Sequence, residues 1–68
     1  MKLNQDQIKL EMARQRLTVN ELCQKAGVSY LSFSNINAGK QNPRPVTVGK
    51  LAYALGVPVE QIIEMEGA

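Results

Sequence analysis

The sequence predicts an all-α domain of five short helices, and three observations support this fold class. Apolar residues recur three and four positions apart along most of the 68 residues, as on the buried face of a helix. Glycines interrupt that pattern at Gly27, Gly39 and Gly56, where helices are expected to end. Aromatic residues make up only 4% of the chain, so the core must consist of aliphatic side chains, which suits helices better than a sheet. Because so short a chain closes only one core, residues 1–68 are expected to form a single domain.

The first helix is expected to begin after Asn4, whose side chain can cap it, with Gln7 available to complete a capping box. Ile8 and Met12 lie four residues apart and define its buried face, and Leu17 should enter the core where the helix ends. The opposite, solvent-facing side is expected to hold most of the polar residues, namely Lys9, Glu11, Arg14, Gln15 and Arg16.

The second helix is expected between Thr18 and Gly27. Thr18 and Glu21 have the spacing of a capping box, and Gly27 can adopt the left-handed conformation that ends a helix. The buried face of this helix should consist of Leu22, Cys23 and Ala26.

The third helix is expected to begin after its N-cap, Ser29, and to run to about Ala38, just before Gly39. Phe33 and Ile36 are three residues apart and should face inward. The residues on the outer side or its margin are then Tyr30, Leu31, Ser34 and Asn35.

The segment from about residue 18 to 38 predicts a helix-turn-helix. Two helices that cross steeply through a short turn need a small side chain where they approach, and Cys23 meets that need. Gly27 supplies the positive φ of the turn, Val28 fills the core beneath it, and Ser29 caps the next helix.

The C-terminal third predicts two more helices after a polar, basic loop. The loop spans Lys40–Pro45 and is expected to lack regular structure because it contains two prolines. A fourth helix is expected at about Val46–Leu55, and a fifth should begin near Pro58. The apolar faces of these helices should hold Val48, Leu51, Ala52 and Leu55, and then Val59, Ile62, Ile63 and Met65.

The composition excludes several classes of function. The chain has no histidine and a single cysteine, Cys23, which we expect in the core, so nothing supports a disulfide framework, a metal site or histidine-based catalysis. With no glycine-rich phosphate loop and only six scattered acidic residues, we expect no enzyme, catalytic residue, cofactor or small-molecule substrate. No apolar run approaches the roughly 20 residues that span a membrane, and the polar start, Met1–Lys9, is unlike a signal peptide. We therefore expect a cytoplasmic protein whose net charge of +2 permits binding to nucleic acid.

Short motifs beyond the turn extend the pattern to most of the chain, in one ungapped register from about Ile8 to Ile63. They are Gly27-Val28-Ser29, Gly39-Lys40, Asn42-Pro43, Thr47-Val48, Lys50-Leu51-Ala52 and Ala54-Leu55-Gly56-Val57. No single dipeptide among them is informative, but with the complete set the chain resembles the Cro/CI-like (XRE) repressor family. That resemblance implies the five-helix, lambda-repressor-like fold, with the helix-turn-helix at the second and third helices.

The resemblance also implies sequence-specific binding of double-stranded DNA by a bacterial or phage transcription regulator, most simply a repressor. In this family the third helix enters the major groove. The family's base-contacting positions fall on Ser29, Tyr30, Leu31, Ser32, Ser34 and Asn35, which we call the reading face. These residue types suit the task, since Asn pairs with adenine, Ser serves several bases, and Leu or Tyr packs on a thymine methyl. The family's phosphate-contacting positions fall on Thr18, Val19, Asn20, Lys40, Gln41, Asn42 and Arg44.

Three departures from the family bear on target and affinity rather than on fold. Val19 stands where the family usually has a Gln whose amide grips a phosphate. Met12 and Asn37 stand where the family often pairs an Arg with a Glu, and the absence of both partners together leaves no unpaired buried charge. The reading face also lacks Arg and Lys, so the commonest guanine contact is missing.

Two alternatives about partners stay open at this point. The C-terminal apolar residues are more numerous than one small domain needs, which predicts a homodimer through the last helix, bound to an inverted repeat. These residues are Val57, Val59, Ile62, Ile63 and Met65. The alternative function is a protein-interaction adaptor, or an antitoxin-like module, that has kept the fold but binds DNA weakly.

Overall fold

Five helices and one small sheet make up the computed structural model, which describes residues 2–64. The elements are β1 (Lys2–Leu3), α1 (Gln5–Gln15), α2 (Val19–Ala26), α3 (Tyr30–Asn37), α4 (Pro45–Leu55), α5 (Val59–Ile62) and β2 (Ile63–Glu64). The prediction of an all-α fold with five helices is confirmed for the helices, and the fold is mostly helical because a two-stranded sheet accompanies them.

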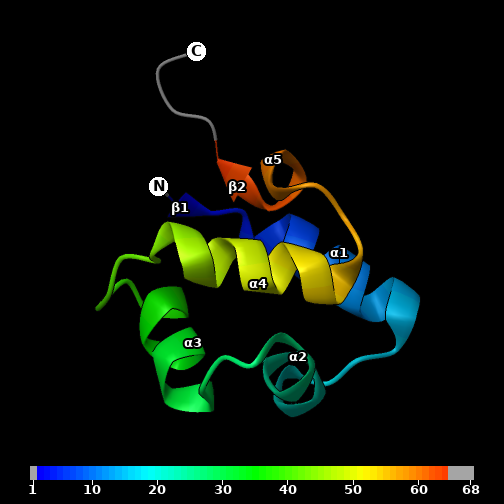
Figure 1. Cartoon of the computed structure of the whole chain (residues 1–68), viewed down its shortest axis with the longest axis horizontal. Coiled ribbons are helices and arrows are strands. Elements are labelled where there is room, and N and C mark those ends of the chain that lie inside the picture. Colours follow the sequence, from blue (N-terminus) through cyan, green and yellow to red (C-terminus); the bar gives the residue numbers. More distant parts are fainter. Residues whose placement is uncertain (1, 65–68) are drawn as a thin grey trace.

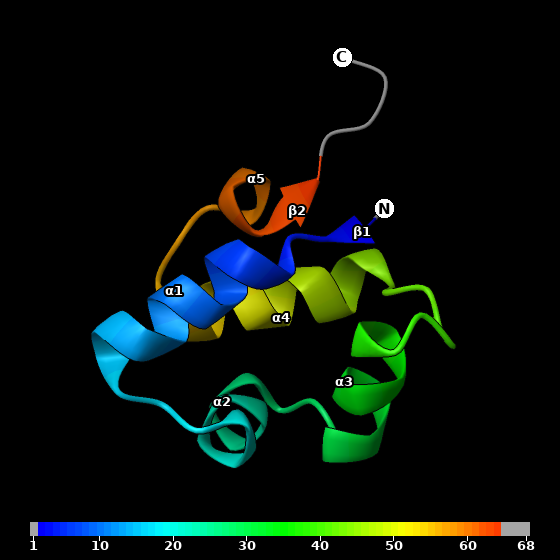
Figure 2. The ribbon, with the colours of Figure 1, turned by 180° about the vertical axis from the view of Figure 1, so that it is seen from behind.

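Helix α4 lies at the centre of the molecule. Figures 1 and 2 show α2 and α3 along one edge of it and α5 with the sheet along the opposite edge, while α1 crosses its rear face in Figure 1. Its buried side chains are those of Val48, Leu51, Ala52, Ala54 and Leu55. The remaining core comes from β1 and the other four helices, with no residue of β2: Leu3, Ile8, Leu22, Cys23, Phe33, Ile36 and Ile62. Since α2 and α3 both rest on this core, the helix-turn-helix is held as part of one packed body.

The N-caps predicted for the first three helices are present, but Gln7 does not complete a capping box at Asn4, whose N–H donates to the Ile62 carbonyl instead. The Asn4 side chain accepts from the Gln7 N–H at 3.2 Å, while Ser29 Oγ accepts from the Ser32 N–H at 3.1 Å. Thr18 and Glu21 form both bonds of the capping box, so the start of α2 is fixed by local contacts. Gly27 ends α2 in the left-handed conformation, with φ of 73°.

The two-stranded sheet was not predicted, and it corrects the extent of the fifth helix. Helix α5 ends at Ile62, and Ile63 lies in β2, where it is the antiparallel partner of Leu3. The Asn4 N–H donates to the Ile62 carbonyl at 2.8 Å, which continues the pairing. A strand of two residues has no periodicity that a sequence pattern can reveal. Met65, predicted on the same helix, lies outside the described residues.

Two more expectations were wrong, one about the exposure of Glu11 and one about the place of Pro45. Glu11, expected on the solvent side of α1, is only 5% exposed because it accepts hydrogen bonds from Arg14 and from Gln61 of α5, both at 2.8 Å. Pro45, expected in the irregular loop, is the first residue of α4, where its missing N–H costs nothing.

Helix α1 also ends earlier than expected. Its last residue is Gln15, and Arg16 follows with φ of 58°, the left-handed conformation that glycine adopts after α2. The Leu17 N–H donates to the Met12 carbonyl at 2.9 Å, which closes the helix end.

Candidate nucleic-acid interface

Helix α3 presents large apolar side chains to solvent at its first turn. Leu31 is 70% exposed and Tyr30 is 56% exposed, although Phe33 and Ile36 on the same helix are buried. Of the other predicted base-contacting residues, Ser29 and Ser34 are exposed, while Ser32 and Asn35 are half-buried. Four of the six predicted reading-face residues are thus exposed, and the two buried residues of α3, Phe33 and Ile36, lie outside that set.

The turn between α2 and α3 is built as the sequence predicts. Cys23 is buried, and its carbonyl accepts from the Val28 N–H at 3.0 Å across the turn. Val28 packs against the core from its half-buried position. Burial raises the pKa of the Cys23 thiol, which keeps it protonated and unreactive, as a core residue should be.

The start of α2 offers a second group of predicted phosphate contacts. Thr18 and Asn20 are exposed, whereas Val19 is half-buried and packs against the core. Val19 can therefore serve a phosphate only through its backbone N–H, which in the first turn of a helix has no intrahelical partner. The hydrogen bond from the Thr18 backbone N–H, and then that with the Thr18 side chain, lower the pKa of Glu21.

The loop after α3 supplies the positive charge near the reading face. Lys40, Gln41, Asn42 and Arg44 are all exposed, and Arg44 is the residue that precedes α4. Among residues 2–64, the ion pairs are Lys2–Glu64 and Arg14–Glu11, so neither Lys40 nor Arg44 is neutralised by a carboxylate of the described chain. Such cations suit phosphate contacts.

A hollow of about 290 Å³ joins the reading face to this loop. We call it the polar hollow; it is lined by Gly27, Val28, Ser29, Ser32, Gln41, Arg44, Thr47 and Lys50. It brings two predicted base contacts together with two predicted phosphate contacts, but it does not include the start of α2.

Sequence reasoning missed Thr47 and Lys50 as candidates for this site. A signal was available, because Arg44, Thr47 and Lys50 follow one another at intervals of three and so share one side of a helix that begins at Pro45.

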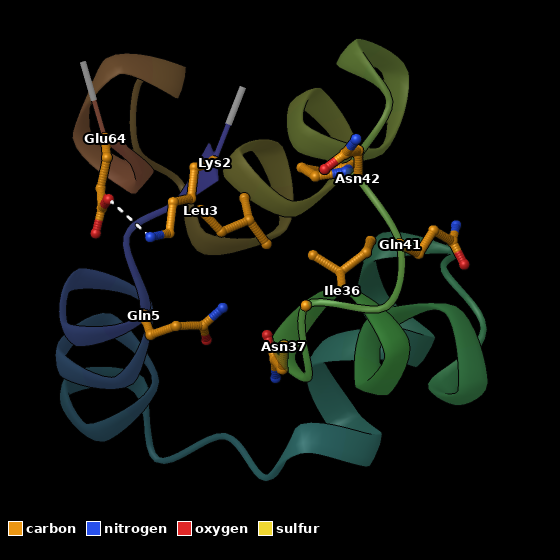
Figure 3. Close-up of a pocket in the computed structure, with 10 residues that line it drawn as sticks. Lys2, Leu3, Gln5, Ile36, Asn37, Gln41, Asn42 and Glu64 are labelled. Atoms are coloured by element: carbon orange, nitrogen blue, oxygen red, sulfur yellow. Dashed lines mark ion pairs between the residues drawn. The ribbon is translucent and has the colours of Figure 1, made fainter. Parts of the chain in front are cut away.

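A larger hollow, of about 580 Å³, lies between the sheet, the start of α1 and the end of α3 (Figure 3). Its walls include the amide side chains of Gln5, Asn37, Gln41 and Asn42, and the Lys2–Glu64 ion pair of 3.7 Å closes one side. Gln41 lines both hollows, so the loop after α3 separates them.

Metal binding and membrane insertion were two further possibilities for the described part of the chain. Within residues 2–64 no three His, Cys, Asp or Glu side chains gather where they could hold a metal ion. None of the helices in the same range has the length and apolar character needed to cross a membrane.

Comparison with known protein families agrees with this geometry. Residues 7–68 match the sequence model of the Cro/C1-type HTH DNA-binding domain. This match begins within α1 and covers α2 to α5, and therefore both helices of the predicted helix-turn-helix.

Two curated proteins of Bacillus subtilis (strain 168) are similar to this chain. One is named HTH-type transcriptional repressor RghR and is 38% identical over 63 residues, which cover 91% of this chain and 47% of that protein. The other is named uncharacterized HTH-type transcriptional regulator RghRB and is 42% identical over 59 residues, which cover 84% of this chain and 42% of that protein. This chain thus spans less than half the length of either relative.

Proposed function

Because this chain belongs to the Cro/C1-type HTH DNA-binding family, we propose that it represses transcription by placing α3 in the major groove of specific duplex DNA sites. The family is one of DNA-binding regulators and not of enzymes. The repressor role is supported by the name of the relative RghR, which is 38% identical to this chain.

The observation that carries the proposal is the exposed first turn of α3. Leu31 and Tyr30 stay more than half exposed on a helix whose other face is anchored in the core. Large apolar side chains in such a position suit contact with a thymine methyl, and the half-buried Asn35 beside them can pair with adenine. The serines of the reading face add hydrogen bonds to bases or phosphates.

Exposed polar groups on both sides of α3 support its docking on the sugar–phosphate backbone. Thr18, Asn20 and the Val19 backbone N–H are proposed to contact phosphates on one side, and Lys40, Gln41, Asn42 and Arg44 on the other. These contacts would fix the position of α3 without reading sequence.

A homodimer on an inverted repeat is the second part of the proposal. An eight-residue α3 reaches only a few base pairs, so a second copy would supply the discrimination that one lacks. The C-terminal apolar residues support this less than the sequence suggested: Ile62 is buried, and Val57, Val59 and Ile63 pack against the core of their own chain. Because the DNA of a bacterium lies in its cytoplasm and the two relatives are bacterial proteins, we propose a cytoplasmic location.

The test measures binding of the chain to duplex DNA by fluorescence anisotropy at several salt concentrations. Lys40→Ala and Arg44→Ala should each weaken binding to all sequences and reduce the salt slope by about 0.9 for each phosphate that the variant no longer neutralises. Lys9→Ala, an exposed lysine on α1, serves as the control of equal charge change. A folded protein that binds no DNA but captures a protein partner would instead establish the adaptor function.

A further inference from the structure

We propose that the polar hollow holds one backbone phosphate of the bound DNA, with Lys50 and Thr47 of α4 as binding residues in addition to Arg44. This inference rests on the proposed function and deepens it, because it assigns α4 a direct part in binding that the sequence did not suggest.

The charge of the hollow is the first argument. Two of its eight lining residues, Arg44 and Lys50, are cations, and none is acidic. Within residues 2–64, neither cation takes part in an ion pair. Two cations that share a concave surface without a counter-charge repel one another, and an anion between them removes that repulsion.

The hydrogen-bonding groups of the hollow are the second argument. Ser29, Ser32 and Thr47 each contribute a hydroxyl, and Gln41 contributes an amide. Ser29 Oγ already accepts from the Ser32 N–H, but its own O–H is still available to donate. Phosphate oxygens are acceptors, so a wall of hydroxyl, amide and cationic donors matches them.

The position of the hollow is the third argument. It extends from the α2–α3 turn to the first turns of α4 and therefore lies beside the start of α3, where the reading face begins. One water occupies about 30 Å³ in the liquid, so a hollow of about 290 Å³ has room for a phosphate group with several waters. A phosphate bound here would fix how deeply the first turn of α3 enters the groove.

The experiment uses the full chain and a duplex obtained by selection from random DNA. Each phosphate in turn is replaced by an uncharged methylphosphonate, and binding is measured for the unsubstituted protein, for Lys50→Gln and for the control Lys9→Gln. Lys50 is exposed, so its replacement should leave the fold intact, which circular dichroism checks.

We expect one phosphate in each half-site whose neutralisation weakens binding by the unsubstituted protein and by Lys9→Gln on the order of 10-fold. Lys50→Gln should be less sensitive at that same phosphate, where Arg44 still contributes, and its salt slope should be lower by about 0.9. Thr47→Val, which keeps the shape but removes the hydroxyl, should weaken binding less than Lys50→Gln does.

Two results would overturn the assignment, and they are distinguishable. If Lys50→Gln binds DNA with the same salt slope and the same phosphate profile as Lys9→Gln, the polar hollow is not a phosphate site, while the proposed function stands. If the folded, unsubstituted protein selects and binds no DNA, the proposed function fails, and the assignment fails with it.

Discussion

At the scale of single residues, Glu11 shows how one polar side chain can join two distant segments. It is 5% exposed and accepts hydrogen bonds from Arg14 on its own helix and from Gln61 on α5, fifty residues away in sequence. Helical spacing places Glu11 three residues after Ile8 and next to Met12, on the face that α1 buries, but it does not identify Gln61 as the partner of Glu11. Its burial follows only once α5 packs on α1.

Replacing Glu11 with Ala should therefore lower the free energy of unfolding by about 1.5–3 kcal/mol, the range for hydrogen bonds to a charged group. The Arg14 side chain is 62% exposed, so Arg14→Ala should cost less than about 1 kcal/mol and serves as the control. Urea unfolding curves of the three proteins measure both values. Equal destabilisation of the two variants would contradict a structural role for the Glu11–Gln61 contact.

Glu21 gives the capping box of α2 a defined pH dependence. The hydrogen bonds with Thr18 lower the pKa of Glu21 below its ordinary value of 4.5. A carboxyl whose pKa is lower in the folded than in the unfolded state stabilises the fold fully above the unfolded value, and this contribution disappears as the pH falls through the folded value.

The melting temperature of the unsubstituted chain should therefore exceed that of Glu21→Gln at pH 7, and this difference should shrink as the pH is lowered from about 5 to 3. Gln keeps an acceptor for the Thr18 N–H, so the comparison isolates the charge. Thermal melts followed by circular dichroism across this range measure the difference. A difference that stays constant or grows toward low pH would show that Glu21 carries no such linkage.

At the scale of elements, local signals were predicted well and distant pairings were not. The Thr18–Glu21 capping box and the Gly27 turn involve residues at most five apart, so spacing alone identifies them. The β1–β2 sheet pairs Leu3 with Ile63 across nearly the whole chain, and two residues per strand leave no pattern to detect. Glycines with positive φ also follow the helices where the sequence predicted helix ends. The exception is Arg16, which ends α1 in a left-handed conformation more usual for glycine.

The stability of the turn between α2 and α3 should depend on the backbone conformation of Gly27 and not on steric room for a side chain there. Its φ is 73°, and a Cβ added there would meet nothing within 4 Å. Gly27→Ala should then cost about 1–2 kcal/mol through the left-handed conformation alone, while the folded fraction still binds DNA. Chemical denaturation gives the stability, and anisotropy at low temperature gives the binding. A folded Gly27→Ala protein that cannot bind DNA would contradict this expectation and show that the added methyl group obstructs the DNA where Gly27 lines the polar hollow.

At the scale of the whole molecule, the core and the reading face are two sides of the same helix. Phe33 is 2% exposed on α3, whereas Leu31 and Tyr30 on the same helix are 70% and 56% exposed. The sequence predicted this division because Phe33 and Ile36 have helical spacing. It did not reveal the polar hollow, since Lys50 and Ser29 meet only when α4 packs beside the α2–α3 turn.

Phe33→Ala should cost about 3–5 kcal/mol, a large part of the roughly 5–15 kcal/mol that stabilises a domain of ordinary size. This variant should fail to bind DNA because it unfolds. Leu31→Ala is the matched change on the exposed side of α3, and it should alter stability by less than about 0.5 kcal/mol. Thermal denaturation of both proteins tests this contrast. A stable, cooperatively folded Phe33→Ala protein would mean that the ring contributes little to the core.

Selection of random duplex DNA by the purified chain at about 0.1 M salt, with Leu31→Ala in parallel, tests the central claim most directly, because at this salt mainly close contacts persist. We predict that the unsubstituted chain enriches an inverted repeat and that folded Leu31→Ala loses or changes preference at specific base pairs. An enriched single half-site would retain sequence-specific binding but contradict the dimer. No enrichment by a demonstrably folded protein would contradict DNA reading by α3. The same would follow if Leu31→Ala and variants at the other reading-face residues enriched the same sequence as the unsubstituted chain.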